Sequence, residues 1–434
     1  MSRPTVSRTS IVCSSGKDKH TYDSERADPP QRSVCSEPPS EVSSLSSLET
    51  ESLVKRDSVV RRLDVRHPLR SNGKYHNPWP TWDAPSLAFN LLRFGRHAKI
   101  PSKQELDRTL PVLEPDFKAS VPPDDGLAIT WLGHSSVLVR FDGISVLTDP
   151  MFSERASPSQ AIGPKRYRNP PCSLHDLPEN LDAVVISHAH YDHLDRNSIL
   201  VLNARFGADL RFFVPSGLGQ WMRALGVENC VELEWWQEGH VPDKSDGLSP
   251  LFHSSIPPNG SNPLIMSAFL VSFVFLPAQH WSRRTLTDDN RALWGGWAVI
   301  GPKQRFFFAG DTGYCDAFRQ IGRLYGPFSA SAIPIGAYEP RSLHRCHAVE
   351  PEEAVLIHQD VQSMFSLAIH WGTFALTDEP FLEPRQRLCA AVDNAGLPSD
   401  SFVAFFPGET RVVLTGGRVL SSTSFRSKKQ FSIQ

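Results

Sequence analysis

One short segment in the middle of the chain constrains its fold and chemistry most: His188-Ala189-His190-Tyr191-Asp192-His193-Leu194-Asp195. Three imidazoles and a carboxylate fall within six residues, directly after the apolar run 183–186. An apolar run of this kind is typical of a buried strand, so the polar residues are predicted on the loop that leaves it. Histidine and aspartate are ligands suited to zinc. One such loop can supply two adjacent metals, and ions about 3.5–4 Å apart form the usual hydrolytic pair for phosphate esters.

The composition is that of a globular protein without a nucleic-acid partner. The 434 residues are 40% hydrophobic and 10% aromatic, which is enough to bury a substantial core, and the net charge of −2 gives no general attraction to nucleic acid. The seven cysteines are scattered and form no C-x-x-C pair, which favours free thiols in a reducing compartment. The N-terminus lacks a hydrophobic signal core, so we expect an intracellular protein.

The chain divides by composition into a tail, one large domain and a second tail. Residues 1–54 contain fourteen serines and a single aromatic residue, Tyr22, so we predict disorder there. A basic linker, 55–70, completes this N-terminal tail, and a weak electrostatic tether to anionic lipid is the alternative to a solvated linker. A catalytic domain is predicted over 71–415, with a flexible Ser/Pro/Gly-rich insertion at 242–263, followed by a C-terminal tail at 416–434.

Within the domain, strand and helix signals alternate. Three strands are predicted at 128–132, 136–141 and 144–147, with a hairpin turn at Asp142-Gly143. Helical stretches follow at 197–206 and 219–225, and the alternation favours a layered α/β domain. No segment is a convincing membrane span. The most apolar stretch, 264–276, has thirteen residues where about 17–25 are needed, so we expect a loop and then a core strand at 271–276. A lipid-dipping loop is the alternative there.

Further candidate ligands each follow an apolar strand, and all but Asp149 stand next to a glycine or an aromatic residue. Strand-end loops can gather at one edge of a sheet, so this repeated pattern predicts that the side chains converge. A lone histidine in this position is usually structural. A two-metal site, however, needs two histidines and one aspartate more than the 188–193 cluster supplies, and residues of these types follow the later strands. The candidates are His280, Asp311 and His370 as ligands, with His134 and Asp149 as groups that orient a ligand or simply form turns.

The motif H-x-H-x-D-H followed by His, Asp and His resembles the metallo-β-lactamase superfamily. Longer strings resemble the N-acylphosphatidylethanolamine-hydrolysing phospholipase D family within it, over roughly residues 75–410. These strings are far more specific than the superfamily motif. They are Gly163-Pro164-Lys165-Arg166, Trp294-Gly295-Gly296-Trp297, 306–314, 335–341 and 370–374.

This resemblance implies an αβ/βα sandwich with two zinc ions at one edge. The implied ligands are His188, His190 and His280 for one ion, Asp192, His193 and His370 for the other, and Asp311 as the bridge. Asp192 and Asp311 are the implied catalytic carboxylates, as charge-compensating ligands, with a role in proton transfer left open. Tyr191 matches a substrate-contacting position of the family, and Arg283 matches a basic position near its bile-acid site.

The chain departs from the family at one substrate-contacting position. The family has a histidine three residues before the Pro of a Pro-Glu-Glu-Ala string, and this chain has Ala348 there, with His347 one residue earlier. Either the loop shifts and His347 takes the role, or the contact is lost. Since residues 342–346 lack a strand pattern, we predict a loop in which His347 substitutes.

The implied activity is hydrolysis of N-acylphosphatidylethanolamine to N-acylethanolamine and phosphatidic acid. A substrate held in membranes implies peripheral attachment, expected at the cytosolic face. Two other readings remain open: another hydrolase of this fold, acting on a lactone, a cyclic phosphate or RNA, with the near-neutral charge counting against RNA, and a non-catalytic lipid-binding module. A bile-acid-like amphiphile as a second ligand and a homodimer are open as well.

Overall fold

The computed structural model of the chain describes residues 65–84, 101–241 and 271–421. The predicted tail up to residue 64 and the predicted insertion 242–263 lie outside the described residues, as does the end of the C-terminal tail.

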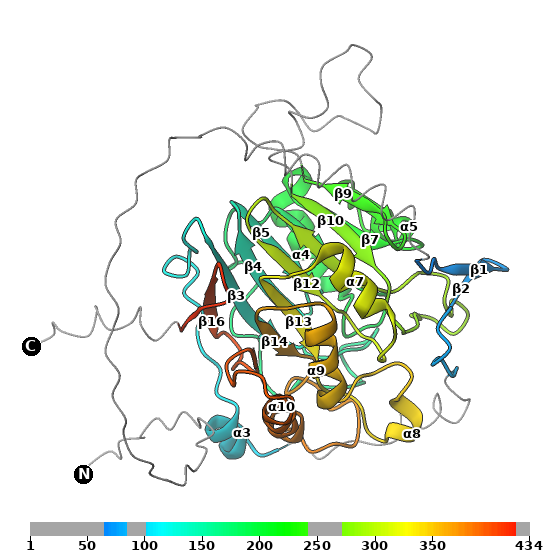
Figure 1. Cartoon of the computed structure of the whole chain (residues 1–434). Helices are drawn as coiled ribbons and strands as arrows, with labels where there is room; N and C mark the ends of the chain where they lie inside the picture. Colours follow the sequence, from blue (N-terminus) through cyan, green and yellow to red (C-terminus); the bar gives the residue numbers. More distant parts are fainter. Residues whose placement is uncertain (1–64, 85–100, 242–270, 422–434) are drawn as a thin grey trace, which may run out of the picture. The chain divides into compact units, whose positions relative to one another are not determined.

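Two twisted β-sheets lie face to face and form the centre of the fold (Figure 1). The eight-stranded sheet has the order β17-β16-β3-β4-β5-β6-β7-β8 and the seven-stranded sheet the order β15-β14-β13-β12-β11-β10-β9. The first comprises β3 (Gly126–Gly133), β4 (Ser136–Phe141), β5 (Ile144–Thr148), β6 (Ala183–Val185), β7 (Arg211–Pro215), β8 (Cys230–Leu233), β16 (Thr410–Leu414) and β17 (Val419–Ser421). The second comprises β9 (Glu238–His240), β10 (Ser272–Leu276), β11 (Gly296–Ile300), β12 (Arg305–Phe308), β13 (Ala330–Pro334), β14 (Ser366–Ile369) and β15 (Phe402–Val403).

The strands predicted at 128–132, 136–141, 144–147 and 271–276 are confirmed as β3, β4, β5 and β10. Asp142 and Gly143 both have positive φ, 47° and 78°, which is the backbone of a tight two-residue hairpin turn. Among the described residues, no helix is both long and apolar enough to cross a bilayer.

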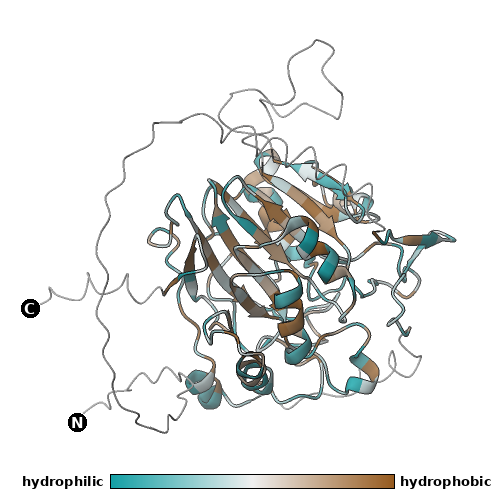
Figure 2. Ribbon diagram, in the orientation of Figure 1, coloured by the Kyte–Doolittle hydropathy of each residue, from teal (hydrophilic) through white to brown (hydrophobic). Residues whose placement is uncertain are grey.

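Helices cover the outer face of each sheet, which gives the predicted αβ/βα order of layers. On the eight-stranded sheet, α4 (Arg196–Phe206) and α5 (Gly219–Ala224) bury apolar side chains against β6 and β7. On the seven-stranded sheet, α9 (Pro351–Asp360) packs against β13 and lies between its neighbours α7 (Ala317–Tyr325) and α10 (Glu383–Asn394). Figure 2 shows hydrophobic strands inside and hydrophilic surfaces on the covering helices. The remaining helical elements are α3 (Lys103–Thr109), α8 (Arg341–His344) and the short η1 (Gly207–Asp209).

Backbone and aromatic contacts join the two sheets near the end of β6. The indole N–H of Trp297 on β11 donates to the carbonyl of Ile186, at 2.9 Å, and the amide of Gly295 donates to the carbonyl of Ser187, at 3.1 Å. Phe213 on β7 stacks on Phe273 on β10, with ring centroids 4.2 Å apart. The loop after β6 is therefore held against the opposite sheet.

Strand direction brings the candidate residues to one edge. Strands β5 to β8 run parallel to one another, as do β12 to β15. The loops that follow β6, β12 and β14 therefore leave at carboxyl ends, where ligand sites of parallel sheets gather.

Paired strands lie on both sides of each predicted domain boundary. Leu69–Ser71 (β1) pairs with Lys74–His76 (β2), so the predicted boundary between residues 70 and 71 falls inside a hairpin. At the other end β16 turns through Gly416 and Gly417, both at positive φ, and pairs with β17. The predicted C-terminal tail from 416 therefore begins with a strand. Both hairpins are too short to show an alternating apolar pattern in the sequence.

Candidate metal centre

The loop after β6 folds into a tight turn that gathers its polar side chains. The amides of His193 and Leu194 both donate to the carbonyl of His190, at 3.1 and 2.9 Å. The turn ends where the side chain of Asp195 accepts from the amide of Asn197 and so caps α4. Short bonds within the loop explain how consecutive residues can point to one place.

Three histidines form one group of converging nitrogen atoms. His188 Nε2 lies 2.8 Å from His190 Nδ1, and His280 Nε2 lies 3.3 Å from the same atom. His188 and His190 come from the loop after β6, and His280 follows β10 in the other sheet. All three are buried, so their nitrogens face one another away from water.

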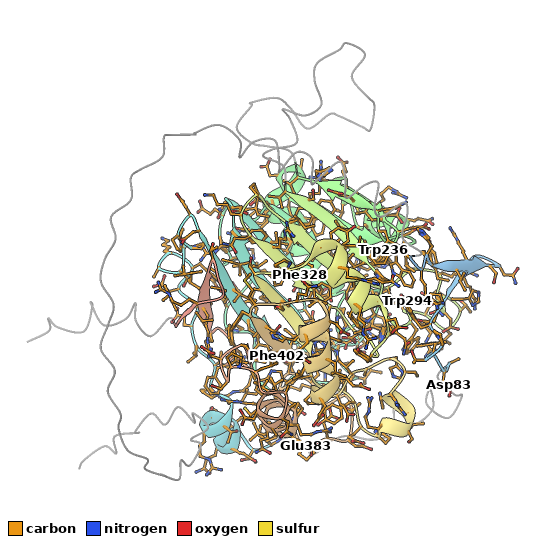
Figure 3. The ribbon with its side chains drawn as sticks, in the orientation of Figure 1. Asp83, Trp236, Trp294, Phe328, Glu383 and Phe402 are labelled. Atoms are coloured by element: carbon orange, nitrogen blue, oxygen red, sulfur yellow. The ribbon has the colours of Figure 1, made fainter. Side chains whose placement is uncertain are left out.

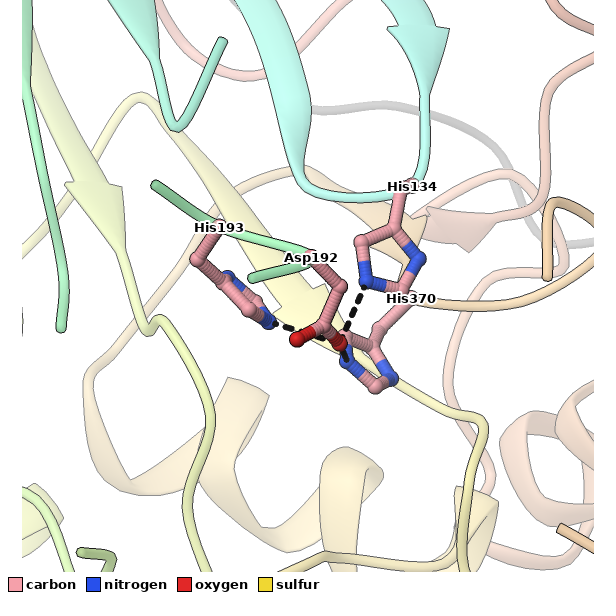
Figure 4. A group of neighbouring side chains, drawn as sticks. All are labelled: His134, Asp192, His193 and His370. Atoms are coloured by element: carbon pink, nitrogen blue, oxygen red, sulfur yellow. Dashed lines mark hydrogen bonds and ion pairs between the residues drawn. The ribbon is translucent and has the colours of Figure 1, made fainter. Parts of the chain in front are cut away.

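A second group surrounds the carboxylate of Asp192 (Figure 4). Its Oδ2 atom lies 3.1 Å from His134 Nε2, and 3.5 Å from Nε2 of both His193 and His370. His134 follows β3 and His370 follows β14. This group also combines residues of both sheets.

Asp311, which follows β12, stands between the two groups. Its Oδ2 atom lies 3.1 Å from His370 Nε2 and 3.2 Å from His193 Nε2. The same atom lies 3.9 Å from His280 Nε2 and 4.0 Å from His188 Nε2. A single carboxylate thus faces histidines of both groups, which is the position expected of a bridging ligand.

Hydrogen bonds on the outer side of four rings set which nitrogen faces the site. Nδ1 of His188 lies 2.9 Å from Ser187 Oγ, and Nδ1 of His193 lies 2.7 Å from Asp149 Oδ2. Nδ1 of His280 lies 2.7 Å from the carbonyl of His347. Nδ1 of His370 lies 3.3 Å from the carbonyl of Gly336. Because carbonyl and carboxylate oxygens only accept, and Ser187 donates its own proton to Asp149, each Nδ1 carries a proton and each Nε2 is the atom that faces the site, with a lone pair whenever the ring is neutral.

The inner atoms fit a bound cation. Oδ1 of Asp311 is buried and has no hydrogen-bond partner among the described residues, and the buried Nε2 atoms of His193 and His370 have only their ion-pair contacts to Asp192 and Asp311. Groups of this kind are normally paired in a folded protein. Inward lone pairs on imidazoles, together with two carboxylates, are the donor set of a metal site.

The charges of the site favour the same occupant. Burial alone would raise the pKa of Asp192 and of Asp311, but facing imidazoles, His193 foremost, hold both pKa values well below the usual range. Burial lowers the pKa of His280 to about 4, which keeps that ring neutral. Burial would also lower the pKa of His370, but Asp311 and Asp192 outweigh it and raise that pKa to about 9. The two carboxylates therefore attract positive charge, and a metal ion would compete with a proton for it.

The two candidate orienting residues contact the ligand groups directly. Asp149 also accepts from the amide and the hydroxyl of Ser187, at 2.7 and 2.5 Å. The amide of His370 donates to the carbonyl of His134 at 3.1 Å, and the amide of His134 donates to Thr373 Oγ1 at 2.7 Å. His134, Asp149 and His370 all have positive φ, so each sits in a turn and contacts the site from it.

A cavity opens onto both ligand groups. Its lining includes His190, Asp192, His280, Asp311 and His370, together with Trp281. A further part of the wall comes from the end of α8, with His344, and from the turn after it, with His347 and Ala348.

The wall beside the cavity is anchored by large buried side chains. Trp294 is fully buried, and its indole N–H donates to the carbonyl of Ala278 at 3.1 Å, two residues before His280 (Figure 3). Gln279 Nε2 donates to the carbonyl of Cys346 at 2.8 Å. The strand end that carries His280 is therefore tied to the segment that carries His347.

Two residues predicted to contact ligands are not among the described residues that line the cavity. The hydroxyl of Tyr191 donates to the carbonyl of Arg284 at 2.9 Å. The guanidinium of Arg283 lies 5.4 Å from the ring centre of Trp281 and 3.3 Å from Asp289. The roles predicted for Tyr191 and Arg283 stay predictions.

Sequence reasoning missed four residues around the site: Ser187, Gln279, Thr373 and His344. Ser187 and Gln279 directly precede predicted ligands, so their position in the chain was the available signal. His344 lies four residues before Ala348, a spacing that becomes informative only if the segment is helical.

Comparisons with known proteins agree with this geometry. A family model described as a β-lactamase superfamily domain matches residues 145–371. The N-acyl-phosphatidylethanolamine-hydrolyzing phospholipase D 1 of Caenorhabditis elegans is 40% identical over 360 residues, which cover 79% of this chain and 93% of that protein. The chain belongs to the N-acylphosphatidylethanolamine-hydrolysing phospholipase D family of the metallo-β-lactamase superfamily.

Further relatives of the chain come from a yeast and a bacterium. A mitochondrial N-acyl-phosphatidylethanolamine-hydrolyzing phospholipase D of Saccharomyces cerevisiae is 32% identical over 262 residues, covering 60% of this chain and 50% of that protein. An uncharacterized protein of Mycobacterium tuberculosis is 41% identical over 274 residues, covering 62% of this chain and 64% of its own length. This member of the family is thus a hydrolase whose clustered histidines and aspartates form a metal-binding site.

Proposed function

We propose that this chain is a zinc-dependent phospholipase D that hydrolyses N-acylphosphatidylethanolamine to N-acylethanolamine and phosphatidic acid. The observation that carries the proposal is the carboxylate of Asp311 facing two groups of buried ligands at once. Such an arrangement suits two metals and a phosphodiester, and family membership points to this lipid.

In this proposal two zinc ions are held by the chain's histidines and aspartates. Nitrogen-rich sites with few carboxylates favour zinc over magnesium or calcium, which prefer oxygen ligands. When bound, the ions would supply a water that is deprotonated near neutral pH and positive charge beside the phosphoryl oxygens. The ligand sets are His188, His190 and His280 for one ion, Asp192, His193 and His370 for the other, and Asp311 between them.

The chain's own residues prepare the site for phosphoryl transfer. Asp192 and Asp311 are ionised because their pKa values are depressed, so they offset part of the metals' charge. The four outward Nδ1 hydrogen bonds fix ring orientation, so the ligands need not reorganise when substrate binds. Burial of the ligands limits the water that can compete for the metals.

The substrate and its setting remain part of the proposal. A lipid substrate places the enzyme at a membrane surface, to which it attaches peripherally. Tyr191 and Arg283 would act side by side. Arg283 belongs to the loop 283–288, and the Tyr191 hydroxyl donates to the backbone of that loop. A bile-acid-like amphiphile near Arg283 would meet Trp281, which reaches from Arg283 to the cavity. A homodimer stays a prediction.

The direct test is hydrolysis by the purified full-length protein. N-acylphosphatidylethanolamine and ordinary phosphatidylethanolamine, dispersed in the same detergent, should be compared by mass spectrometry of the products. We expect N-acylethanolamine and phosphatidic acid from the first lipid and far slower release from the second. Removal of metal by a chelator should abolish turnover, and added zinc should restore it. Full activity of thoroughly metal-free protein would contradict the proposal.

A further inference from the structure

The end of α8 and the turn that follows it place two residues on one helical face. The amide of Ala348 donates to the carbonyl of His344 at 2.9 Å, which is the i to i+4 bond of an α-helix. The amide of His347 bonds to the same carbonyl at 3.0 Å. Residues four apart in such a turn lie on the same side, so the His344 ring and the Ala348 methyl are neighbours there. Both residues line the cavity above the ligand groups.

His347 has a different position in the same turn. It is only 4% exposed, whereas His344 and Ala348 are half-buried. The carbonyl of His347 accepts from His280, and its Nδ1 atom lies 3.5 Å from Cys346 Sγ. His347 therefore forms part of the wall that supports His280, and His344 is the more accessible imidazole.

Hydrogen bonds from Arg341 hold the backbone of the turn that carries His344. The Nη1 atom of Arg341 donates to the carbonyl of Ala348 at 2.7 Å, and its Nη2 atom donates to Glu353 at 2.9 Å. Glu353 belongs to the capping box that starts α9. The turn is thus held at Ala348 through Arg341 and at Cys346 by the bond from Gln279.

We propose that His344 is a substrate-binding residue whose imidazole donates a hydrogen bond to an oxygen of the phosphodiester group. A neutral imidazole always carries one N–H donor, and a phosphodiester offers charged acceptor oxygens. Both His344 and Ala348 line the cavity, so the proposed hydrogen bond would be made inside it. This inference rests on the proposed function, because it assigns the phosphodiester to the same cavity.

The first experiment compares His344→Ala with wild type, using a dispersed short-chain N-acylphosphatidylethanolamine. We expect kcat/KM to fall about tenfold or more, equivalent to about 1.4 kcal/mol. Zinc content should be unchanged. Calorimetry should show that short-chain phosphatidic acid, which retains the phosphate, binds His344→Ala about tenfold more weakly. Arg345→Ala is the matched control, because Arg345 is exposed and does not line the cavity.

A rescue variant gives the sharper test. In His344→Ala combined with Ala348→His, the imidazole moves one turn along the same face, so phosphatidic acid binding and kcat/KM should recover in large part. His344→Gln, which keeps an N–H donor, should lose less than His344→Ala and covers the case in which His344→Ala misfolds.

Two outcomes would overturn the inference. One is unchanged phosphatidic acid binding by a folded His344→Ala. The other is a silent His344→Ala together with a loss in His347→Ala at constant zinc content, which would assign the contact to His347 as the sequence predicts. If wild type bound phosphatidic acid through His344 but released no N-acylethanolamine, the proposed function would fail and the binding site would stand.

Discussion

Oδ2 of Asp149 lies 2.7 Å from Nδ1 of His193, and both side chains are fully buried. Asp149 follows β5 and His193 belongs to the loop after β6, so the pair joins two neighbouring strand ends. The contact turns Nε2 of His193 toward Asp192 and Asp311. Asp149 thus sets the orientation of a proposed ligand without facing the cavity itself.

Replacing Asp149 with asparagine should weaken binding of the second metal. The amide keeps the shape but removes the charge that orients and strengthens His193 as a ligand, so affinity should fall about 10- to 100-fold. Zinc competition with a fluorescent chelator measures this, and excess zinc should restore turnover. Asp182→Asn is the matched control: it removes a carboxylate that is buried before β6 and bonds Ser145 at 2.8 Å. Equal zinc affinity of Asp149→Asn and wild type would show that the contact is only structural.

Replacing Asp311 with asparagine should affect both metals at once, because its carboxylate faces both groups of ligands. We expect a loss of several orders of magnitude in kcat and a zinc content well below that of wild type. The far-ultraviolet circular dichroism should be unchanged, since the core does not depend on this side chain. Near-normal turnover of Asp311→Asn would show that the bridging assignment is wrong.

The exposed leucine of the loop 283–288 should contribute to membrane attachment. Leu286 is 92% exposed, and the loop is braced by Asp288, which accepts from the amides of Arg284 and Thr285. Arg284 ties the loop to the metal-binding segment by donating to the carbonyl of Ala189 at 2.9 Å. Burying a leucine contributes about 1.5–3 kcal/mol, so Leu286→Asp should weaken binding to phosphatidylcholine vesicles about tenfold or more.

Vesicle sedimentation at two salt concentrations tests the physical basis of this attachment. Binding of wild type should survive moderate salt, because apolar burial is not screened. Leu356→Asp, on the outer surface of α9, is the control and should bind as wild type does. Release of all the protein by high salt would instead indicate electrostatic attachment.

His358 should make the folded domain sensitive to acid. Burial lowers its pKa to about 4, and its Nδ1 lies 2.8 Å from Ser366 Oγ. Its ring stacks on that of Phe402, which Figure 3 labels. An unfolded histidine has a pKa of about 6.5, so the unfolded state takes up the proton first as pH falls. The stabilisation from neutral His358 is therefore complete above about pH 6.5 and is lost on the way down to about pH 4.

The measurement is urea unfolding of wild type and His358→Gln at several pH values. Between about pH 7.5 and 4.5, the free energy of unfolding of wild type should fall relative to that of the variant by something on the order of 2 kcal/mol. Both proteins lose metal at low pH to the same extent, so the comparison between them cancels that effect. A difference that does not change with pH would contradict the role of His358.

The structure brings the predicted ligand residues together for a physical reason. His188, His190, Asp192 and His193 are almost contiguous, so any tight loop after a strand brings them together. His280, Asp311 and His370 follow apolar strands. Strands that run in the same direction place such positions at one edge of the sheet. The layered α/β fold follows from the same alternation of strands and helices.

Other features depend on tertiary contacts that no local sequence pattern predicts. The orientation of Tyr191 depends on the backbone of Arg284, ninety-three residues away. The relation between His344 and Ala348 requires knowing that the turn after α8 is helical. The domain edges at β1 and β17 are three-residue strands that gain stability only from pairing.

The most direct test of the central claim is the fate of water oxygen during turnover. N-acylphosphatidylethanolamine should be hydrolysed by the purified enzyme in water enriched in oxygen-18, and both products analysed by mass spectrometry. Attack on phosphorus predicts one labelled oxygen in the phosphate of phosphatidic acid and none in N-acylethanolamine. Label in the N-acylethanolamine hydroxyl, or release of diacylglycerol with phosphorylated N-acylethanolamine, would contradict the account.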